Sequence, residues 1–421
     1  MLLVGAGHFN RISISVAGTE RLIKHQGIAE TQMGWVYTSY LIVYTLCMTP
    51  GGLFIDRFGP KLALFAVLGG SAVFMALTGL SGLLLTAPFA LWVALLAIRS
   101  VMGMFNAPQH PGAAHMVGNW ITPAGRNLAN GVVNFAALVG VSSTYIVFGW
   151  LIDLFDWTGA AFCASAGTLL LAVIWILAAS DRPPEEITKK LQRVSRPASG
   201  GVGLLLRNRS LVILTISYAL AGYFQYLFFY WAQYYFETIR EVPAGTSRIY
   251  TTILTLANGV GMVIGGWLTD ACRMRSGKGR AWMLVPAGSL LLGAAILLPG
   301  IHVEETLVTF GCFTMAMLVV GASEGSYWTL SVELGGERGG TAAGILNTGG
   351  NAGGLAAPVV TPYLSQWFGW QSGFVVAGVF CIIAALCWLG IDPHERVAEP
   401  KVKEELDAEI MLPPDSRIRP G

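Results

Sequence analysis

Long apolar runs alternate with short polar segments along the whole chain. A run of about 18 or more apolar residues predicts a helix that crosses a bilayer. The pattern predicts twelve such helices, at residues 1–19, 33–54, 62–83, 88–117, 126–150, 158–179, 210–236, 249–270, 281–299, 306–331, 340–365 and 371–390. We therefore expect an all-α membrane protein whose main partner is the lipid bilayer.

Composition supports this prediction and excludes several classes of protein. The chain of 421 residues is 54% hydrophobic and 12% charged, and this charged share is about half of that in soluble proteins. Its six cysteines are scattered without a C-x-x-C pair, unlike zinc or redox motifs. The net charge of +2 gives no sign of a nucleic-acid partner. We expect no metal and no cofactor.

The basic residues are distributed unevenly between the two sides that these helices define. If both termini lie on the inner side, the outer segments contain few lysines and arginines, namely Arg21, Lys24, Arg240 and Arg248. Cytoplasmic loops carry the excess of basic residues in membrane proteins. The chain is therefore expected to be a multi-pass protein of the inner (plasma) membrane, with both termini in the cytoplasm.

Matching stretches recur in the two halves of the chain. "GLFIDRFGPK" at 52–61 follows the second predicted helix, and "GWLTDACRMRSGKGR" at 266–280 follows the eighth. "GVVN" recurs as "GILN", and Trp157 matches Trp370. Shared glycine-rich composition does not explain the repeated aspartate and tryptophan. The expected organisation is a six-helix bundle, a cytoplasmic linker, a second six-helix bundle and a cytoplasmic tail, at residues 1–179, 180–209, 210–390 and 391–421. Duplicated membrane proteins bind their ligand between the halves.

Several of these stretches resemble a known family. "GGLFIDRFGPK" resembles the signature loop of the major facilitator superfamily, which implies the twelve-helix fold of that family. "NRISISVAG", "RSVMGMFNAPQHPGAA" and "ELGGERGGTAAGILNTGGNAGG" are similar to the anion:cation symporter family, which carries sugar acids and other organic anions. This resemblance implies that Arg11 and Arg99 hold the substrate carboxylate. Asn10 and Asn106 stand where relatives often carry the acids that resemble proton-coupling groups.

The two arginines point to an anion independently of the resemblance. Arg11 lies eight residues before Thr19 and Arg99 lies eleven residues after Pro88, so both lie roughly 12–17 Å from the outer end of their helices. An arginine at the bilayer centre costs at least ~2.5–3.5 kcal/mol to insert and is expected to face a cavity or a partner. An anionic substrate would supply that partner. The alternative is that an arginine reaches an interface or bonds backbone carbonyls where prolines break the fourth helix.

Further polar and aromatic side chains inside the predicted helices are candidates for substrate contact. Amides donate and accept hydrogen bonds, as a polyhydroxylated acid requires. The resemblance implies substrate contact for two of them, Tyr44 and Asn351. Each amide has the alternative of bonding a neighbouring helix, and each aromatic that of packing. The candidates are Tyr44, Asn134, Tyr223, Gln225, Asn258, Trp328, Asn347 and Asn351.

Two titratable residues are candidates for proton coupling. Glu324 is the one acidic residue well inside a predicted helix, and a desolvated carboxyl can carry a proton at neutral pH. Its alternative is an inner-gate residue that bonds neighbouring helices. His110 in the fourth helix has an imidazole that titrates near neutrality, with a structural polar role as its alternative.

The inner loops contain candidate gating residues. Asp56 is expected to accept a salt bridge that locks one conformation, because Asp270 recurs at the matching place in the second half. Gly51 and Gly52 are expected to allow close helix approach. The alternative is a simple basic anchor on the cytoplasmic side. The full set is Gly52, Asp56, Arg57, Lys61, Arg126, Asp270 and Arg338.

The leading functional hypothesis is secondary active transport of a small organic anion by alternating access, coupled to a proton or sodium ion. Two alternatives stay open: an uncoupled uniporter or exchanger, and a transporter-like receptor. The chain contains no G-x-x-x-x-G-K-[ST], and its G-x-S-x-G match, "GASEG" at 321–325, lies inside the predicted membrane helix 306–331 and not at a strand-to-helix turn, so an enzyme or a nucleotide-driven pump is not expected. A monomer is expected.

Overall fold

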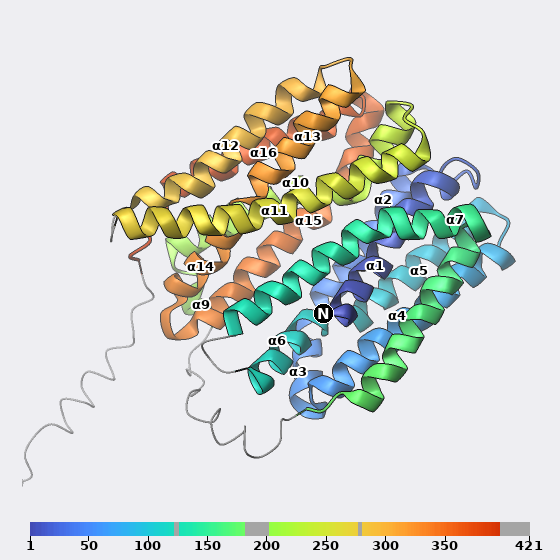
Figure 1. Cartoon of the computed structure of the whole chain (residues 1–421), viewed down its shortest axis with the longest axis horizontal. Coiled ribbons are helices and arrows are strands. Elements are labelled where there is room, and N and C mark those ends of the chain that lie inside the picture. Colours follow the sequence, from blue (N-terminus) through green and yellow to red (C-terminus); the bar gives the residue numbers. More distant parts are fainter. Residues whose placement is uncertain (122–125, 182–201, 277–279, 396–421) are drawn as a thin grey trace, which may run out of the picture.

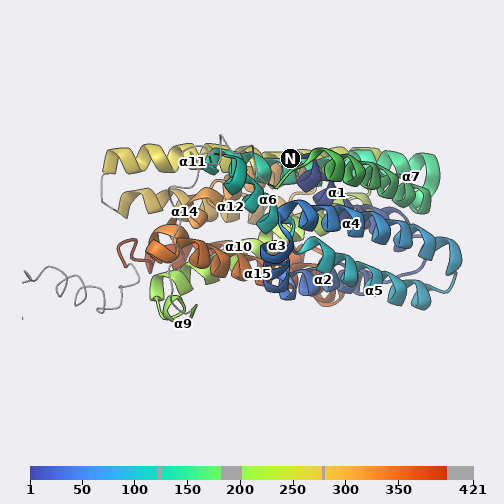
Figure 2. The same cartoon turned by 90° about the horizontal axis from the view of Figure 1, so that it is seen from below.

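The computed structural model describes residues 1–121, 126–181, 202–276 and 280–395. This part of the chain consists of helices and their connections and contains no strand. The long helices run side by side (Figure 1), and the view from below shows the same arrangement (Figure 2). Most of the expected linker, 180–209, and of the expected tail, 391–421, lies outside the described residues.

The first half of the chain forms seven helices, drawn in blue to green in Figure 1. The longest of them, α7, turns at Asp156, which has a positive φ of 58° and a ψ of 173°. It therefore contains the fifth and sixth predicted membrane helices in succession. The helices are α1 (Leu2–Ala17), α2 (Glu30–Leu46), α3 (Met48–Phe58), α4 (Pro60–Leu84), α5 (Pro88–Asn106), α6 (Gln109–Trp120) and α7 (Arg126–Ala178), and η1 (Gly18–Leu22) extends α1.

The second half forms a separate group of helices, drawn in light green to red. They are α9 (Val202–Leu205), α10 (Arg209–Tyr234), α11 (Ala244–Ser276), α12 (Leu284–Ile301), α13 (Thr306–Gly321), α14 (Glu324–Gly335), α15 (Gly339–Phe368) and α16 (Gln371–Leu389). Three short turns of helix join them, η3 (Tyr235–Ile239), η4 (Arg280–Met283) and η5 (Gly336–Arg338).

Three of the predicted membrane helices are interrupted, which positions polar side chains inside the bundle. The predicted helix 88–117 divides into α5 and α6 at Pro108, because proline removes a backbone donor and clashes with the preceding turn. The helix 33–54 divides at Cys47, and the helix 306–331 divides just before Glu324. Such breaks are tolerated in a membrane where the freed backbone groups lie within the protein.

The predicted number of membrane helices is consistent with these elements. Eight helices of the described chain are long and apolar enough to cross a membrane, or nine if one bent pair is counted as a single span. One of the eight is α7, which covers two predicted helices. Helix α1 has only 16 residues, and α15 is rich in glycine and asparagine, so neither passes that test. The chain is an all-α, multi-pass membrane protein.

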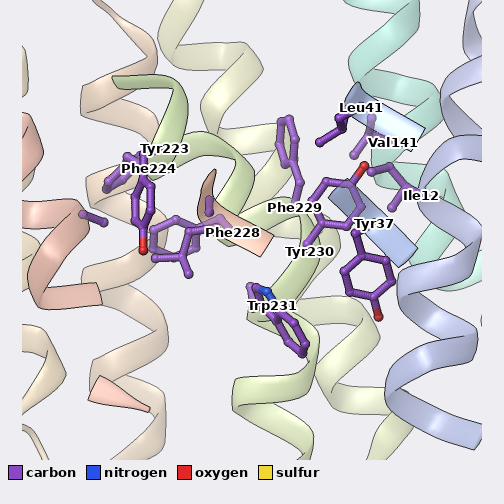
Figure 3. Packing of buried hydrophobic residues seen from close by; sticks show 14 of the residues in the cluster. Ile12, Tyr37, Leu41, Val141, Tyr223, Phe224, Phe228, Phe229, Tyr230 and Trp231 are labelled. Carbon is purple, nitrogen blue, oxygen red and sulfur yellow. The ribbon is translucent and has the colours of Figure 1, made fainter. Parts of the chain in front are cut away.

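Helix α10 carries a band of aromatic side chains that forms much of the core between the two halves. Tyr223, Phe224 and Trp231 are buried, and Tyr230 stacks on Tyr37 of α2 with ring centres 5.0 Å apart. Figure 3 shows this aromatic row beside residues of the first half. The band packs helices together, and it leaves polar side chains of the same helix to line a cavity.

Candidate functional site

Two cavities lie inside the bundle, one lined by residues of the second half, including Tyr226, and the other by residues of the first half. The larger, which we call the amide pocket, has a volume of about 80 Å³ and is formed by α10, α11, α13, α14 and α15. Five candidates from the sequence line this pocket together, namely Gln225, Asn258, Glu324, Asn347 and Asn351. Its polar lining consists of Tyr218, Gln225, Tyr226, Asn258, Ser323, Glu324, Asn347 and Asn351.

The amides of this pocket are linked in short hydrogen-bonded chains. Gln225 Nε2 donates to Asn258 Oδ1 at 3.0 Å, and Asn258 Nδ2 donates to the carbonyl of Met317 at 3.1 Å. The Tyr226 hydroxyl donates to Asn351 Oδ1 at 3.1 Å. These bonds fix the amide planes, so the pocket presents oriented donors and acceptors to a ligand.

Glu324 contributes a carboxyl group to the amide pocket. The Tyr218 hydroxyl donates to its Oε1 at 2.6 Å, and Trp328 Nε1 donates to the same oxygen at 2.9 Å. No lysine, arginine or histidine of the described residues forms an ion pair with it. The carboxyl is therefore held by two neutral donors, both on one oxygen. Trp328 serves as its support rather than as a lining residue.

The smaller cavity, which we call the arginine pocket, has no room for a water molecule in this conformation. Arg11 is 9% exposed, and its Nε donates to the Tyr230 hydroxyl at 3.3 Å. The guanidinium carbon lies 5.0 Å from the centre of the Tyr226 ring, an attractive arrangement of cation and aromatic face. The complete lining is Gly7, His8, Arg11, Tyr40, Tyr44, Gln109 and His110.

Arg11 has no carboxylate partner among the described residues. A buried cation without a counter-ion is costly, because the interior of the bundle cannot solvate it as water does. Tyrosine hydroxyls and ring faces offset only part of that cost. The arginine pocket is therefore a site that favours a bound anion.

Arg99 lies close by but is directed differently. Its Nη2 donates to the backbone carbonyl of Arg11 at 2.6 Å and to that of Asn10 at 3.0 Å. The side chain is 1% exposed and is absent from the lining of both cavities. Its guanidinium carbon lies 5.6 Å from the centre of the Tyr40 ring. The guanidinium carbon of Arg11 lies 5.7 Å from the same ring centre. In this conformation Arg99 therefore bonds backbone carbonyls of α1, and not the carbonyls at the break of the fourth helix that the alternative interpretation named.

Two histidines lie beside Arg11. His110 Nε2 lies 3.4 Å from His8 Nε2, and Gln109 Nε2 lies 3.0 Å from His8 Nδ1. His110 was a candidate from the sequence, whereas His8 was not. The available signal was the spacing of His8 and Arg11, which are three residues apart in α1 and so share a helix face.

Two other candidates lie away from the cavities. Asn134 is exposed on α7 and lines neither of them. Tyr223 is buried against Phe380 and its hydroxyl lies 3.2 Å from that of Thr361. Its role in this structure is packing.

The inner-side gating residues do not form an ion-pair latch between the described halves. Asp56, Arg57 and Asp270 are exposed, and none of them has an ion pair with a described residue. The backbone N–H of Lys61 donates to Asp181 Oδ1 at 2.7 Å. Arg338 lies in η5, and the side chain of Arg126 lies outside the described residues.

The expectation for Gly52 was wrong. A Cβ added there would meet nothing within 4 Å, whereas one added at Gly51 would come within 3.1 Å of Pro108. Consecutive residues of a helix point in different directions, so only one of the two glycines faces the neighbouring helix. Close helix approach therefore depends on Gly51.

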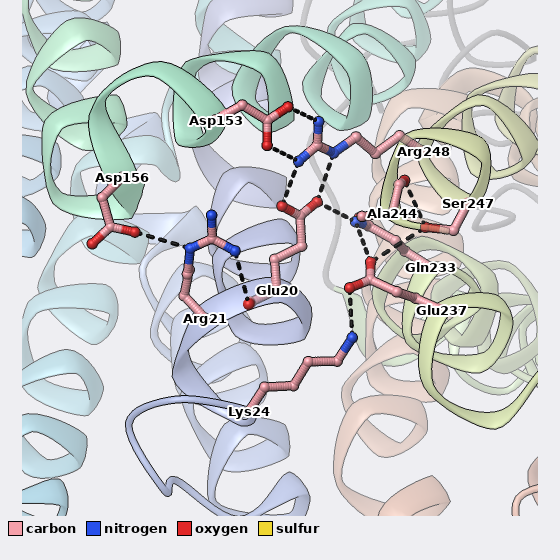
Figure 4. A network of polar contacts seen from close by, with 10 residues as sticks. All are labelled: Glu20, Arg21, Lys24, Asp153, Asp156, Gln233, Glu237, Ala244, Ser247 and Arg248. Carbon is pink, nitrogen blue, oxygen red and sulfur yellow. Dashed lines mark hydrogen bonds and ion pairs between the residues drawn. The ribbon is translucent and has the colours of Figure 1, made fainter. Parts of the chain in front are cut away.

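The opposite end of the bundle carries a partly buried ionic network between the two halves (Figure 4). Arg248 of α11 donates from Nη2 to Glu20 Oε2 at 2.6 Å and from Nη1 to Asp153 Oδ2 at 2.5 Å. Gln233 Nε2 donates to Glu20 Oε1 at 2.8 Å, and Lys24 pairs with Glu237 at 2.6 Å. We call these six residues the Arg248 network. Sequence reasoning missed it, although its charges flank the expected outer helix ends.

The Arg248 side chain depends on a glycine in the facing helix. A Cβ at Gly149 of α7 would lie 2.3 Å from Arg248 Nε, closer than van der Waals contact permits. At the start of α2, Glu30 Oε1 accepts a hydrogen bond from the Tyr234 hydroxyl of α10 at 2.7 Å. Hydrogen bonds and ion pairs therefore join the two halves at this end.

The helix bundle carries an unpaired buried cation in a cavity of its first half and a cluster of amides in a cavity of its second half, as far as the described residues show. Charges inside membrane helices mark substrate pathways in transporters. The family model of the Major Facilitator Superfamily matches residues 1–356 and 334–417. The chain therefore belongs to the Major Facilitator Superfamily.

Relatives and solved structures agree with this assignment. The chain is 25% identical over 419 residues to the probable sulfoacetate transporter of Cupriavidus necator, covering 96% of this chain and 94% of the relative. It is 23% identical over 407 residues to the D-galactonate transporter of Escherichia coli, covering 91% of each. The fold is similar to that of a bacterial homologue of the human lysosomal transporter Spinster, with a TM-score of 0.75, 15% identity and coverage of 95% and 97%.

Proposed function

We propose that the protein is a secondary active transporter of a small organic anion, of the sugar-acid kind, which works by alternating access. The observation that carries this proposal is Arg11, a buried guanidinium in a cavity wall with no carboxylate partner among the described residues. Arginine binds a carboxylate through two parallel hydrogen bonds. One named relative is a D-galactonate transporter and another is a probable sulfoacetate transporter.

In this proposal the two cavities bind different parts of the substrate. The anionic group of the substrate lies in the arginine pocket, against Arg11 and Tyr44. Its body crosses Tyr226 into the amide pocket, where Gln225, Asn347 and Asn351 meet its hydroxyl groups. Arg99 acts through α1, because its bonds to the carbonyls of residues 10 and 11 set the position of the helix that carries Arg11.

Alternating access requires one end of the bundle to close while the other opens. The Arg248 network joins the halves at one end, and the distribution of basic residues assigns that end to the outside. The inner-loop residues Asp56 and Asp270 are exposed in the same conformation. These contacts are those of an outward-closed state, with the termini in the cytoplasm, and the network must break in each transport cycle.

A proton is the proposed coupling ion, and Glu324 is its proposed carrier. The carboxyl lies in the wall of the amide pocket without a basic partner among the described residues, so protonation removes an isolated buried charge. His110, paired with His8 beside Arg11, is a second carrier. The protonation of either group would depend on whether the substrate site is filled.

Uncoupled exchange is the second candidate, and Asn10 and Asn106 favour it. Asn10 Nδ2 donates to the Thr168 hydroxyl at 2.8 Å, and Asn106 Oδ1 accepts from Ser71 at 2.9 Å. Both side chains are neutral and tie helices together, so neither can exchange a proton. A monomer has one such site and needs no second copy for this mechanism.

The function is tested with purified protein in proteoliposomes. We expect labelled D-galactonate or another hydroxy acid to accumulate when the outside is made acidic, and accumulation to stop when the pH gradient is dissipated. Exchange without coupling would give equilibration driven only by an internal anion. Binding of anions without any flux would contradict the transporter proposal and favour a receptor.

Replacing Glu324 by glutamine is expected to preserve anion binding and to abolish accumulation driven by the pH gradient. Glutamine keeps an acceptor for Tyr218 and Trp328 but cannot carry a proton. The measurement is initial uptake against external pH, with counterflow exchange as the second readout, which should persist. The matched control is Glu333→Gln in the same helix, which removes a surface-side partner of Arg273 and should keep gradient-driven uptake. Unchanged pH-driven accumulation in Glu324→Gln would assign coupling elsewhere.

A further inference from the structure

We infer that this transporter selects hydroxylated monocarboxylates over extended dicarboxylates that carry a second acid at the far end of the chain. The inference rests on the proposed function and names the substrate class of the same site. It follows from where the site provides positive charge and where it does not.

Positive charge is confined to one end of the site. Arg11 is the one lysine or arginine that lines either cavity of the described chain. Arg99 lies on the same side, since both guanidinium groups lie within 6 Å of the Tyr40 ring centre, and its Nη2 is already bonded to two backbone carbonyls. The arginine pocket therefore offers positive charge for one anionic group.

The far end of the site offers no cation. The lining of the amide pocket contains no lysine, arginine or histidine, and it contains the carboxyl of Glu324. Its other polar groups are amides and hydroxyls, which pair with the hydroxyls of a substrate. A second carboxylate placed here would lose its hydration without gaining an opposite charge, which is strongly unfavourable.

The conclusion is the same for both protonation states of Glu324. When ionised, this carboxylate repels a second carboxylate across the pocket and accepts a hydrogen bond from a hydroxyl group instead. When protonated, it is a neutral donor that suits a hydroxyl or a carboxylate but supplies no charge. Neither state replaces the missing cation.

Aldonates and aldarates of equal length provide matched probes, because they differ only in a terminal hydroxymethyl or carboxylate group. We propose competition against labelled substrate in proteoliposomes with three pairs: threonate and tartrate, gluconate and glucarate, and galactonate and galactarate. The expected result is that at least one aldonate competes. The dicarboxylate of the same pair should compete at least about 100-fold more weakly.

A cation introduced at the far end should reverse this preference. Gln225 lines the amide pocket on α10, so Gln225→Arg is expected to raise competition by the dicarboxylate at least about tenfold relative to its aldonate. Gln225→Met is the matched control, because it removes the amide without adding charge and should keep the wild-type order. Residual competition by either ligand of a pair shows that a variant is folded.

The outcomes separate this inference from the proposed function. A wild-type protein that takes up a dicarboxylate or sulfoacetate in preference to every aldonate remains an anion transporter, and the inference is wrong. Failure to bind or move any organic anion overturns the proposed function and the inference together. An unchanged ratio in Gln225→Arg, with aldonate competition retained, contradicts the assignment of the far end to the amide pocket.

Discussion

Replacing Arg11 by methionine is expected to abolish anion binding. Arg11 is the one cationic side chain of the described chain that lines the arginine pocket with a permanent charge. A hydrogen bond to a charged group contributes about 1.5–3 kcal/mol, so losing a bidentate pair should weaken binding by about 100-fold or more. Methionine is an unbranched, apolar side chain that can replace the aliphatic part of arginine. The fold should survive, because the variant removes an uncompensated buried charge.

Isothermal titration with the transported anion, supported by thermal-shift measurements, provides the test. Arg11→Lys should recover little affinity, because an ammonium group cannot match the planar fork of a guanidinium. Arg21→Met is the matched control, since Arg21 belongs to the same N-terminal segment but pairs with the exposed Asp156 at 3.0 Å, and exposed pairs contribute about 0–1 kcal/mol. Wild-type affinity in Arg11→Met would remove the basis of the proposed function.

Replacing Arg248 by methionine is expected to open the outer end of the protein and to stop transport. The Arg248 side chain is 8% exposed and neutralises Glu20, which is 1% exposed, together with Asp153. Breaking a buried pair by removing one partner costs about 3–5 kcal/mol. The equilibrium between outward-closed and outward-open states should therefore shift by about 100-fold or more toward opening, where the carboxylates regain water.

Spin labels on His25→Cys and Glu305→Cys, in a background without native cysteines, report the distance between the halves at this end. Both positions are exposed. We expect a longer distance in Arg248→Met and unchanged distances in Arg273→Met. Arg273 belongs to the same helix, but its bidentate partner Glu333 lies in the same half of the chain. An unchanged distance in Arg248→Met would mean that apolar packing alone closes this end.

For Arg99, the role that the family resemblance implied differs from the contacts in this structure. The family resemblance implied that both arginines hold the substrate, and loss of Arg99 should still abolish binding. In this structure the reason differs, because Arg99 bonds the carbonyls of residues 10 and 11 and lines neither cavity. We therefore treat it as a positioning residue for Arg11 in the outward-closed state.

The sequence by itself determined the class of this protein. Apolar runs specify membrane helices because the bilayer core offers no hydrogen-bond partners to backbone groups and no solvation to charges. This energetic cost is large and depends only on the local sequence. The same cost made Arg11 and Glu324 stand out as candidate functional residues, since each is a charge within an apolar run. Repeated motifs and the family resemblance then indicated an anion transporter.

The tertiary structure decided which of these residues meet. Gln225, Asn258 and Glu324 come from three helices, and only their packing brings them to one pocket, whereas Asn134 faces outward. The Arg248 network joins residues more than two hundred positions apart, and no local pattern encodes such a pairing. The direction of a side chain depends on helix rotation and on neighbouring helices, so the charges were visible in the sequence but their partners were not.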